Sequence, residues 1–354
     1  MKALVHTEPY VLDYRTFPDP EVRPRDVLVR IRAVGVCGSD VHGYTGETGR
    51  RVPPIVMGHE AAGVVASVGD RVTRVSPGDR VCFDSTVFCN ECPACRRGAY
   101  NRCEHRQVLG VSVHDMPKRH GCMAELVALP EWVVVPMPDE LSFADAALLE
   151  PVAIALHAVR RGRVAGGDDV LIIGCGTIGL LILQAARLEG AGHVIVSDLD
   201  DTRLELAARL GADVTVNPQA DDLLEVVGRE TDGAGVDVSF EVVGFANTLR
   251  QAVDAAAMGG RVVLVGNLTP RIELGIPDII SRELTLIGSY ASSGEYGEAM
   301  GLVSEGKIDV RSLVGDTLPL SSGQKAFDRL HEGERGLVKI ILEPDGLQIS
   351  RTRT

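Results

Sequence analysis

The chain has 354 residues, of which 45% are hydrophobic and 24% are charged, which excludes a disordered or collagen-like protein. Asp and Glu (49) outnumber Lys and Arg (36), giving a formal net charge of −13 and a pI near 5.2. Such an acidic surface repels phosphate backbones and anionic lipid headgroups, so nucleic acids and membranes are poor candidate partners, and the length favours two domains.

The first 150 residues have the pattern of β structure. Short β-branched runs at Val27–Ala33, Glu60–Val68 and Arg80–Phe83 are separated by turn-forming Pro and Gly residues. The N-terminus lacks the basic stretch and apolar run of a secretory signal. We therefore expect a cytoplasmic protein whose 8 cysteines stay reduced, which makes metal binding a better default than disulfides.

From about residue 151, strand-like runs alternate with longer helical segments, the pattern of a parallel sheet covered by helices on both faces. The expected strands are Val170–Ile173, His193–Ser197, Asp213–Val216, Val236–Glu241 and Arg261–Gly266. The expected helices are one that extends to Arg187 and others at Asp201–Leu210, Asp221–Glu230 and Asn247–Ala257. After about residue 289, shorter mixed elements return.

A glycine-rich loop links the first of these strands to its helix. Gly174-Cys175-Gly176-Thr177-Ile178-Gly179 fits G-x-G-x-x-G, in the strand–turn–helix setting that dinucleotide binding requires. The glycines permit a tight turn, close approach to a pyrophosphate and close helix packing, and the helix N-terminus faces the phosphate charge. The candidate cofactor residues in the loop are Gly174, Gly176, Thr177, Ile178 and Gly179.

The next strand ends at Asp198, close to the spacing expected of a carboxylate that binds ribose hydroxyls. Because a carboxylate repels a 2′-phosphate, we expect NAD rather than NADP, and nearby Arg203 could weaken that preference. The alternative is a packing turn that binds no ligand.

Four cysteines lie within a short segment of few apolar residues, in the order Cys89, Cys92, Cys95 and Cys103. Burial alone cannot fold such a segment, whereas four thiolates around a tetrahedral zinc ion can stabilise it and leave no position for a substrate. An iron–sulfur cluster, an unliganded loop and a disulfide pair are the alternatives.

Three further fragments contain candidate metal ligands: Cys37-Gly38-Ser39-Asp40-Val41-His42, Gly58-His59-Glu60 and Leu149-Glu150-Pro151. Their spacing alone proves little, because a single Cys or His is more often a packed core residue. Their association with a nucleotide loop and a four-cysteine lobe strengthens the case for a reactive metal site.

These motifs, in this order, resemble the zinc-containing medium-chain alcohol dehydrogenases, and within them the polyol branch typified by sorbitol (L-iditol) dehydrogenase. The resemblance implies α/β plus β architecture: a GroES-like β catalytic domain at 1–150 with the zinc lobe at 85–105, a doubly wound parallel-sheet Rossmann NAD-binding domain at 151–288, and a return to the catalytic domain at 289–354. It also implies a homo-oligomer, with a tetramer favoured and a dimer possible.

The resemblance further implies a catalytic zinc held by Cys37 and His59, with Glu150 as the carboxylate ligand of the polyol branch and Glu60 as a conditional ligand. Three protein ligands leave a fourth position open, and zinc there makes a bound hydroxyl more acidic. Ser39 and His42 match the family's proton-relay positions, although a solvated loop histidine is the alternative for His42. We expect two zinc ions per chain, one catalytic and one structural.

The expected reaction transfers hydride from a secondary hydroxyl of a polyol of the sorbitol, L-iditol or galactitol type, or of a similar small polar alcohol, to NAD, giving a ketone. Ser289 stands where sorbitol dehydrogenases carry an arginine, which puts sorbitol itself in doubt. The alternatives are amino-alcohol oxidation of the L-threonine 3-dehydrogenase type and a non-catalytic relative that binds zinc or nucleotide.

Overall fold

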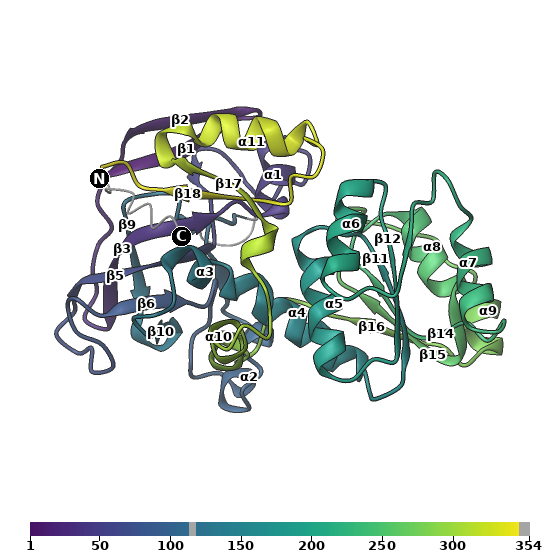
Figure 1. Ribbon diagram of the computed structural model, residues 1–354. Helices are drawn as coiled ribbons and strands as arrows, with labels where there is room; N and C mark the ends of the chain where they lie inside the picture. Colours follow the sequence, from purple (N-terminus) through teal and green to yellow (C-terminus); the bar gives the residue numbers. More distant parts are fainter. Residues whose placement is uncertain (113–117, 347–354) are drawn as a thin grey trace. The chain divides into compact units, whose positions relative to one another are not determined.

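A computed structural model describes residues 1–112 and 118–346 and divides the chain into two compact units (Figure 1). Unit 1 comprises Met1–Glu150 together with the chain from Val314 onward, and unit 2 comprises Pro151–Leu313. None of the described helices is both long and apolar enough to cross a membrane.

Unit 1 is built around a seven-stranded sheet with the order β10-β6-β5-β3-β18-β17, in which β9 also pairs with β3. Two smaller sheets, β2-β1-β4 and β7-β8, complete it. Its strands are β1 (Lys2–Glu8), β2 (Val11–Thr16), β3 (Asp26–Gly35), β4 (Ile55–Val56), β5 (Glu60–Val68), β6 (Arg80–Phe83), β7 (Thr86–Val87), β8 (Gln107–Val108), β9 (Leu126–Pro130), β10 (Val134–Pro136), β17 (Val314–Pro319) and β18 (Lys339–Glu343).

Short helices flank these strands. They are α1 (Gly38–Tyr44), α2 (Pro93–Arg96), α3 (Phe143–Ala147) and α11 (Gly323–His331), with 3₁₀ turns η1 (Tyr100–Arg102), η2 (Glu131–Val133) and η4 (Leu320–Ser322). Helix α4 (Leu149–Gly162) starts at the end of unit 1 and carries the chain into unit 2.

The C-terminal part of the chain is integral to unit 1. Strand β18 pairs antiparallel with β3, with Ile341 opposite Gly35, and β17 pairs in parallel with β18. Ile340, Ile341 and Leu342 are fully buried, so this late segment forms part of the core.

Unit 2 contains a six-stranded, wholly parallel sheet with the order β13-β12-β11-β14-β15-β16. This is the doubly wound order in which the direction of winding reverses beside the first strand. The strands are β11 (Asp169–Ile173), β12 (His193–Ser197), β13 (Val214–Val216), β14 (Val236–Glu241), β15 (Ala256–Leu264) and β16 (Thr285–Gly288).

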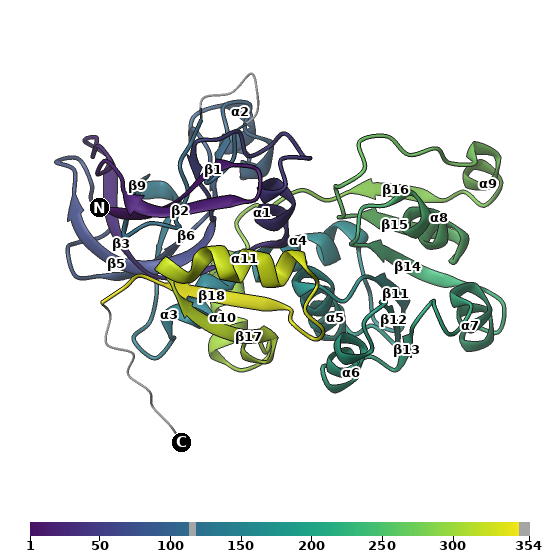
Figure 2. The same cartoon turned by 90° about the horizontal axis from the view of Figure 1, so that it is seen from above.

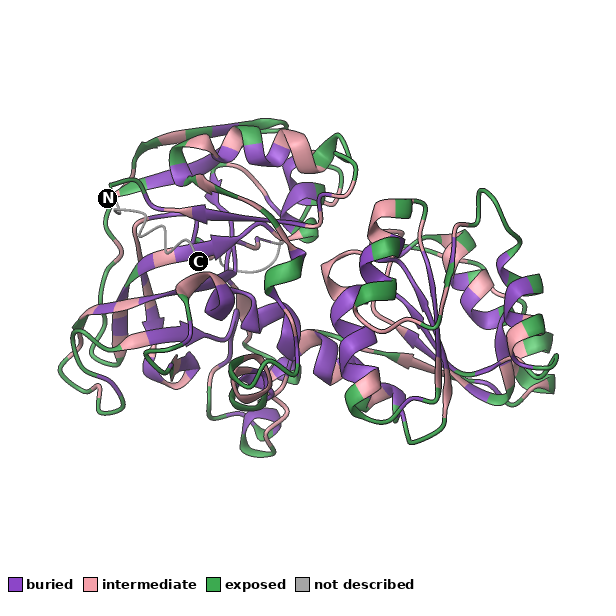
Figure 3. Ribbon diagram, in the orientation of Figure 1, coloured by how far each residue is buried: buried purple, intermediate pink, exposed green. Residues whose placement is uncertain are grey.

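Helices cover both faces of this sheet. The helices of unit 2 after α4 are α5 (Thr177–Leu188), α6 (Asp201–Arg209), α7 (Leu223–Glu230), α8 (Ala246–Asp254), α9 (Ile276–Ser281) and α10 (Tyr296–Ser304), with a 3₁₀ turn η3 (Arg311–Leu313). Helices α5 and α6 lie on one face and α7 and α8 on the other (Figure 2). The central strands are almost entirely buried, and exposed residues gather on the outer sides of the helices (Figure 3).

Two boundaries differ from the sequence-based expectation. Residues 289–313, expected to rejoin the catalytic domain, belong to unit 2 instead. Gln184 on α5 exchanges two hydrogen bonds with the backbone of Asp309, and His157 on α4 contacts Glu295 before α10 at 2.8 Å. These side-chain contacts cross long sequence separations, so the expected return at residue 289 is placed too early.

The second difference concerns the helix expected at Asn247–Ala257. Helix α8 ends at Asp254, and β15 already begins at Ala256, where the backbone N–H of Val236 donates to the carbonyl of Ala255 at 2.9 Å. The run of alanines continues the helical pattern, and only the pairing with β14 ends the helix there.

Candidate functional site

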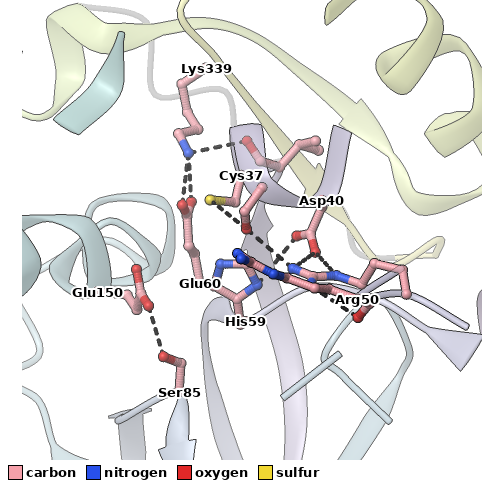
Figure 4. Close-up of polar contacts among 11 residues, drawn as sticks. Cys37, Asp40, Arg50, His59, Glu60, Ser85, Glu150 and Lys339 are labelled. Carbon is pink, nitrogen blue, oxygen red and sulfur yellow. Dashed lines mark hydrogen bonds and ion pairs between the residues drawn. The ribbon is translucent and has the colours of Figure 1, made fainter. Parts of the chain in front are cut away.

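Three candidate metal ligands from two segments of the chain meet in unit 1 (Figure 4). Cys37 directly precedes α1, and His59 and Glu60 stand where the chain enters β5. The ligand atoms of these three residues all lie within 4.8 Å of one another. Gly35 on the paired strand makes room for the side chain of Glu60, because a Cβ there would lie 2.3 Å from its Oε2 atom.

The imidazole of His59 is buried and faces a buried carboxylate. Its Nδ1 atom lies 3.4 Å from Oδ2 of Asp40, whose side chain is fully buried. Burial by itself would lower the pKa of His59, but Asp40 and Cys37 raise it well above its usual value. Because Nδ1 faces Asp40, Nε2 is the ring nitrogen left to bind a metal ion.

Asp40 is in turn held by Arg51, which the sequence did not single out. Nε and Nη2 of Arg51 both donate to Oδ1 of Asp40, at 3.0 and 2.9 Å. Burial would raise the pKa of Asp40, but His59 and Arg51 hold it far below its usual range. Asp40 therefore stays ionised inside the protein.

Glu60 forms a buried ion pair with Lys339 of β18. The Nζ atom of Lys339 donates to both carboxylate oxygens, at 2.7 and 2.9 Å, and to the carbonyl of Val36 at 3.1 Å. Both side chains are 1% exposed, so each charge depends on the other for compensation. Burial would lower the pKa of Lys339, but Glu60, Cys37 and nearby Glu150 raise it.

Glu150 lies beside this cluster at the start of α4, without joining the group within 4.8 Å (Figure 4). Its Oε1 atom accepts a hydrogen bond of 2.7 Å from the buried hydroxyl of Ser85. Its other oxygen, Oε2, is buried with no hydrogen-bond partner among the residues that the structure describes. Burial raises the pKa of Glu150 to about 7, with Glu60 adding to the rise and His59 opposing it.

This donor set fits a zinc ion. A thiolate, an imidazole nitrogen and a carboxylate oxygen together nearly neutralise Zn²⁺, and all three are ordinary zinc ligands. A buried carboxylate oxygen without a partner costs free energy unless a cation or donor satisfies it. The orphaned Oε2 of Glu150 is the feature of the site that points most directly to a bound cation.

Ser39 and His42 lie on α1, next to Cys37. The hydroxyl of Ser39 donates to Sγ of Cys37 at 3.3 Å and accepts from Nη2 of Arg51 at 3.1 Å. Both Ser39 and His42 are exposed, and their spacing of three residues places them on the same side of the helix.

The four cysteines of the lobe also meet, with all four sulfurs within 4.8 Å of one another. Sγ–Sγ distances of 3.5 Å for Cys92–Cys95, 3.6 Å for Cys89–Cys103 and 4.0 Å for Cys89–Cys95 are close to the roughly 3.8 Å edge of a tetrahedron around zinc. All eight cysteines, each in the described part of the chain, are free thiols, so the disulfide alternative is wrong.

Backbone groups prepare the lobe for thiolates. The N–H of Cys89 points at Sγ of Cys103 at 3.3 Å, and that of Cys92 at Sγ of Cys89 at 3.4 Å. The backbone N–H of Cys95 lowers the pKa of Cys92 to about 6, whereas burial raises the pKa of Cys95 and that of Cys103. Such N–H groups stabilise negative charge on sulfur, which a metal ion requires of its ligands.

The glycine loop in unit 2 has the geometry of a nucleotide-binding turn. Gly174 has a φ of +108°, and a Cβ on Gly179 would lie 1.8 Å from the carbonyl oxygen of Gly174. Gly176 caps α5, with open space where its Cβ would be. A side chain on Gly179 would therefore push the helix away from the strand, and one on Gly176 would fill the space outside the helix N-terminus.

Asp198 directly follows β12 and is tied to this loop. Its carboxylate accepts hydrogen bonds from the backbone N–H of Cys175 at 2.6 Å and of Asp200 at 3.0 Å. Arg203 lies on α6, with Nε 3.7 Å from Oδ2 of Asp200. The acid is thus held in a fixed orientation beside the glycine turn.

Comparison with known proteins agrees with this geometry. Residues 23–139 match the alcohol dehydrogenase GroES-like domain, and residues 177–305 match the zinc-binding dehydrogenase family. Sorbitol dehydrogenase of Bacillus subtilis is 34% identical over 349 residues, covering 98% of each chain. The chain belongs to the zinc-containing medium-chain alcohol dehydrogenases. It is a zinc-dependent, NAD(P)-linked enzyme of this family, so the alternative of a non-catalytic relative is wrong.

Two further relatives show how broad this dehydrogenase family is. L-threonine 3-dehydrogenase of Symbiobacterium thermophilum is 37% identical over 335 residues, covering 93% of each chain. A solved zinc-binding dehydrogenase of Sinorhizobium meliloti 1021, bound to NADP, is 34% identical with a TM-score of 0.88, covering 97% of this chain and 99% of its own. Membership therefore fixes alcohol oxidation as the reaction class, but leaves the substrate and the choice between NAD and NADP open.

Three residues that support the dehydrogenase site were not found from the sequence: Arg51, Ser85 and Lys339. Each contacts a candidate ligand or its neighbour across 11 to 279 positions of sequence. Lys339 had one local signal, because it is a charged residue at the head of the apolar run KIILE.

Proposed function

We propose that this dehydrogenase oxidises a secondary hydroxyl of a polyol, of the sorbitol, L-iditol or galactitol type, or of a similar polar alcohol, to a ketone, with NAD as hydride acceptor. The observation that carries the proposal is the buried, unpartnered Oε2 of Glu150 beside the Cys37–His59–Glu60 cluster. The similarity to a sorbitol dehydrogenase over nearly the whole length supports the polyol class.

In this proposal Cys37, His59 and Glu150 are the zinc ligands, and Glu60 remains paired with Lys339. Both oxygens of Glu60 are already engaged by a buried ammonium group, whereas Glu150 has a free oxygen. Zinc, when bound, supplies Lewis acidity that favours loss of the hydroxyl proton of the substrate. Ser85 holds the other oxygen of Glu150 and so fixes the orientation of its carboxylate.

The substrate proton needs a path to solvent, and Ser39 and His42 are the proposed relay. A hydroxyl can accept a proton and pass on its own, and a histidine can exchange protons with water near neutral pH. The exposure of both side chains is consistent with delivery of the proton to solvent.

For the cofactor, we propose NAD rather than NADP, bound by Gly174, Gly176, Thr177, Ile178 and Gly179, with Asp198 on the ribose hydroxyls. The fixed carboxylate of Asp198 would repel a 2′-phosphate, and Arg203 would moderate that repulsion. Two zinc ions per chain follow from the two ligand clusters. The free thiols support a reducing, cytoplasmic location.

We also infer a homo-oligomer, with a tetramer favoured over a dimer. Strand β16 is the edge of the sheet in unit 2, and this unit exposes the apolar side chains of Met258 (71%), Ile276 (58%) and Ile280 (69%). Unpaired edges and exposed apolar side chains are stabilised by contact with another copy of the chain.

The second candidate is oxidation of an amino alcohol, as in L-threonine 3-dehydrogenase. The similarity at 37% identity to an enzyme of that name supports it. The chemistry at the zinc would be the same, and only the groups that recognise the rest of the substrate would differ.

A direct assay separates these candidates. Purified protein is incubated with NAD or NADP and with sorbitol, L-iditol, galactitol, galactitol 1-phosphate or L-threonine, and the reduced cofactor is followed by absorbance. We expect turnover with NAD and a free polyol, which a zinc chelator abolishes. Turnover that survives complete removal of zinc, or turnover with threonine alone, would contradict the proposal.

A further inference from the structure

Arg51 is a buried charged residue next to both the candidate zinc ligands and the candidate relay. It lies between α1 and β4, and its side chain is 3% exposed. Besides its two hydrogen bonds to Oδ1 of Asp40, Nη2 donates to Oγ of Ser39 at 3.1 Å, and Nη1 donates to the carbonyl of Arg50 at 3.4 Å. A single guanidinium therefore contacts two neighbouring side chains with different expected roles.

The contact with Asp40 decides how that carboxylate faces His59. Arg51 takes only Oδ1, and it does so with two N–H groups, which fixes the position of that oxygen. The remaining oxygen, Oδ2, has no hydrogen-bond partner among the described residues and lies 3.4 Å from Nδ1 of His59. Arg51 thus leaves one oxygen of Asp40 available for the imidazole.

The contact with Ser39 decides how its hydroxyl is oriented. A serine hydroxyl has one proton to donate, and Nη2 of Arg51 supplies a hydrogen bond that the oxygen accepts. The hydroxyl proton must therefore point elsewhere, and in the structure it points at Sγ of Cys37, 3.3 Å away. The same side chain that orients Asp40 also turns the Ser39 proton toward the metal ligands.

Helix α1 leaves space for the Arg51 side chain at Gly43. A Cβ at Gly43 would lie 2.1 Å from Cγ of Arg51 and 3.1 Å from its Cβ. Gly43 has an ordinary helical backbone, so its missing side chain serves to admit Arg51 rather than to allow an unusual turn. Alanine at position 43 would displace Arg51 without removing its charge.

We propose that Arg51 is a positioning residue that sets the geometry of the catalytic zinc site and of the proton relay together, through Asp40–His59 and through Ser39. The inference rests on the proposed roles of His59 and Ser39. Lysine cannot replace Arg51 fully, because an ammonium group lacks the planar guanidinium fork. In Arg51, the Nε and Nη2 atoms of this fork both donate to Asp40, and Nη2 also donates to Ser39.

The test compares Arg51→Lys and Gly43→Ala with the wild-type holoenzyme, with Gly228→Ala as control. Gly228 is also a helical glycine, on α7, and has open space at its Cβ position. Cobalt is exchanged into the catalytic site, and the visible absorption of the cobalt protein, the zinc content, thermal unfolding and steady-state kinetics are measured. Ligand-field bands report the geometry around the metal and require no turnover.

We expect both variants to fold with two metal ions, to shift the cobalt absorption and to lose about 10- to 100-fold in kcat with an unchanged KM for NAD. Gly228→Ala should match the wild type in every measurement. An unchanged cobalt spectrum and kcat in Arg51→Lys and Gly43→Ala would overturn the proposal. So would a loss of activity that only follows a loss of folded protein, with the spectrum of the folded fraction unchanged.

The experiment separates failure of this inference from failure of the proposed function. If wild-type protein oxidises none of the polyols, the proposed substrate class fails, yet the cobalt spectra of the variants still answer whether Arg51 orients His59. If the wild type is active and the spectra do not differ, the inference about Arg51 fails alone.

Discussion

The two ligand clusters of unit 1 are assembled in different ways. In the lobe, four thiols of one kind lie between Cys89 and Cys103, and backbone N–H groups of the same segment point at their sulfurs. In the Cys37–His59–Glu60 cluster, taken with neighbouring Glu150, the donors are of three kinds and come from distant segments of the chain. Charged or polar side chains hold the two glutamates. We expect the first arrangement to close a metal site for stability, and the second to orient ligands around a position left open for chemistry.

The largest expected effect comes from Cys37→Ala. Loss of a zinc ligand should lower kcat/KM by at least about 1,000-fold, because the Lewis acid is no longer held in place. The affinity for NAD, measured by fluorescence titration, should change by less than about twofold, because the glycine loop lies in unit 2.

Cys82→Ala is the matched control for that substitution. Cys82 is a buried thiol outside both clusters, and burial raises its pKa to about 12. The Cys82→Ala variant should retain near-normal activity. Equal losses in the two variants would mean that Cys37 is a packing residue and not a ligand.

Cys103→Ala should show the complementary pattern. Metal content should fall from about two zinc ions per chain to about one, and the Tm should fall by about 5–10 °C, because the lobe loses the ion that compensates for its small core. At low temperature the remaining catalytic zinc should still support activity within about threefold of the wild type. Iron and a visible charge-transfer absorption in the purified protein would instead favour the iron–sulfur alternative.

The smallest effect concerns the pH dependence of the zinc-free protein. The pKa of Glu150 is raised from 4.5 to about 7 by burial, with Glu60 adding to the rise. The unfolded chain therefore releases this proton at lower pH than the folded protein does. The free energy of unfolding should fall as pH rises from about 4.5 to about 7, by up to about 3 kcal/mol from this group alone.

Glu150→Gln should remove that part of the slope, and zinc should abolish it in the wild type by stabilising the carboxylate. Denaturant unfolding at several pH values measures both effects. Glu332→Gln, which alters an exposed carboxylate, is the control and should leave the slope as it is. If the free energy of unfolding depends on pH in the same way in the zinc-free wild type and in Glu150→Gln, then Glu150 is not buried in the way described.

The two clusters also differ in how far the sequence could predict them. The spacing of Cys89, Cys92, Cys95 and Cys103 predicts a shared metal ion directly, since the ligands are local. The glycine turn at Gly174 was predicted for the same reason, because strand, turn and helix follow one another along the chain. For Cys37, His59 and Glu150, the residue types and their order suggested the family, and the family suggested the site.

The supporting side chains could not be predicted, because each depends on a long-range contact that leaves no periodic pattern. An arginine after a glycine-rich turn, such as Arg51, is most often exposed, and nothing in its neighbours indicates that Gly43 makes room for it. Lys339 pairs with Glu60 only because β18 returns beside β3, and no local signal specifies that pairing. The ends of α8 and unit 2 were misplaced for the same physical reason, since contacts between distant segments decided both.

The position of β18 has a consequence for the order of events during synthesis. The strand lies between β3 and β17 in the sheet of unit 1, yet the whole of unit 2 separates it from β3 along the chain. Unit 2 is contiguous in the chain and can fold as soon as it emerges, whereas unit 1 must wait with an open sheet edge at β3. Until β18 arrives, Glu60 lacks the ammonium group of Lys339, so a nascent chain stalled before Lys339 would leave uncompensated a carboxylate that the mature enzyme buries in an ion pair.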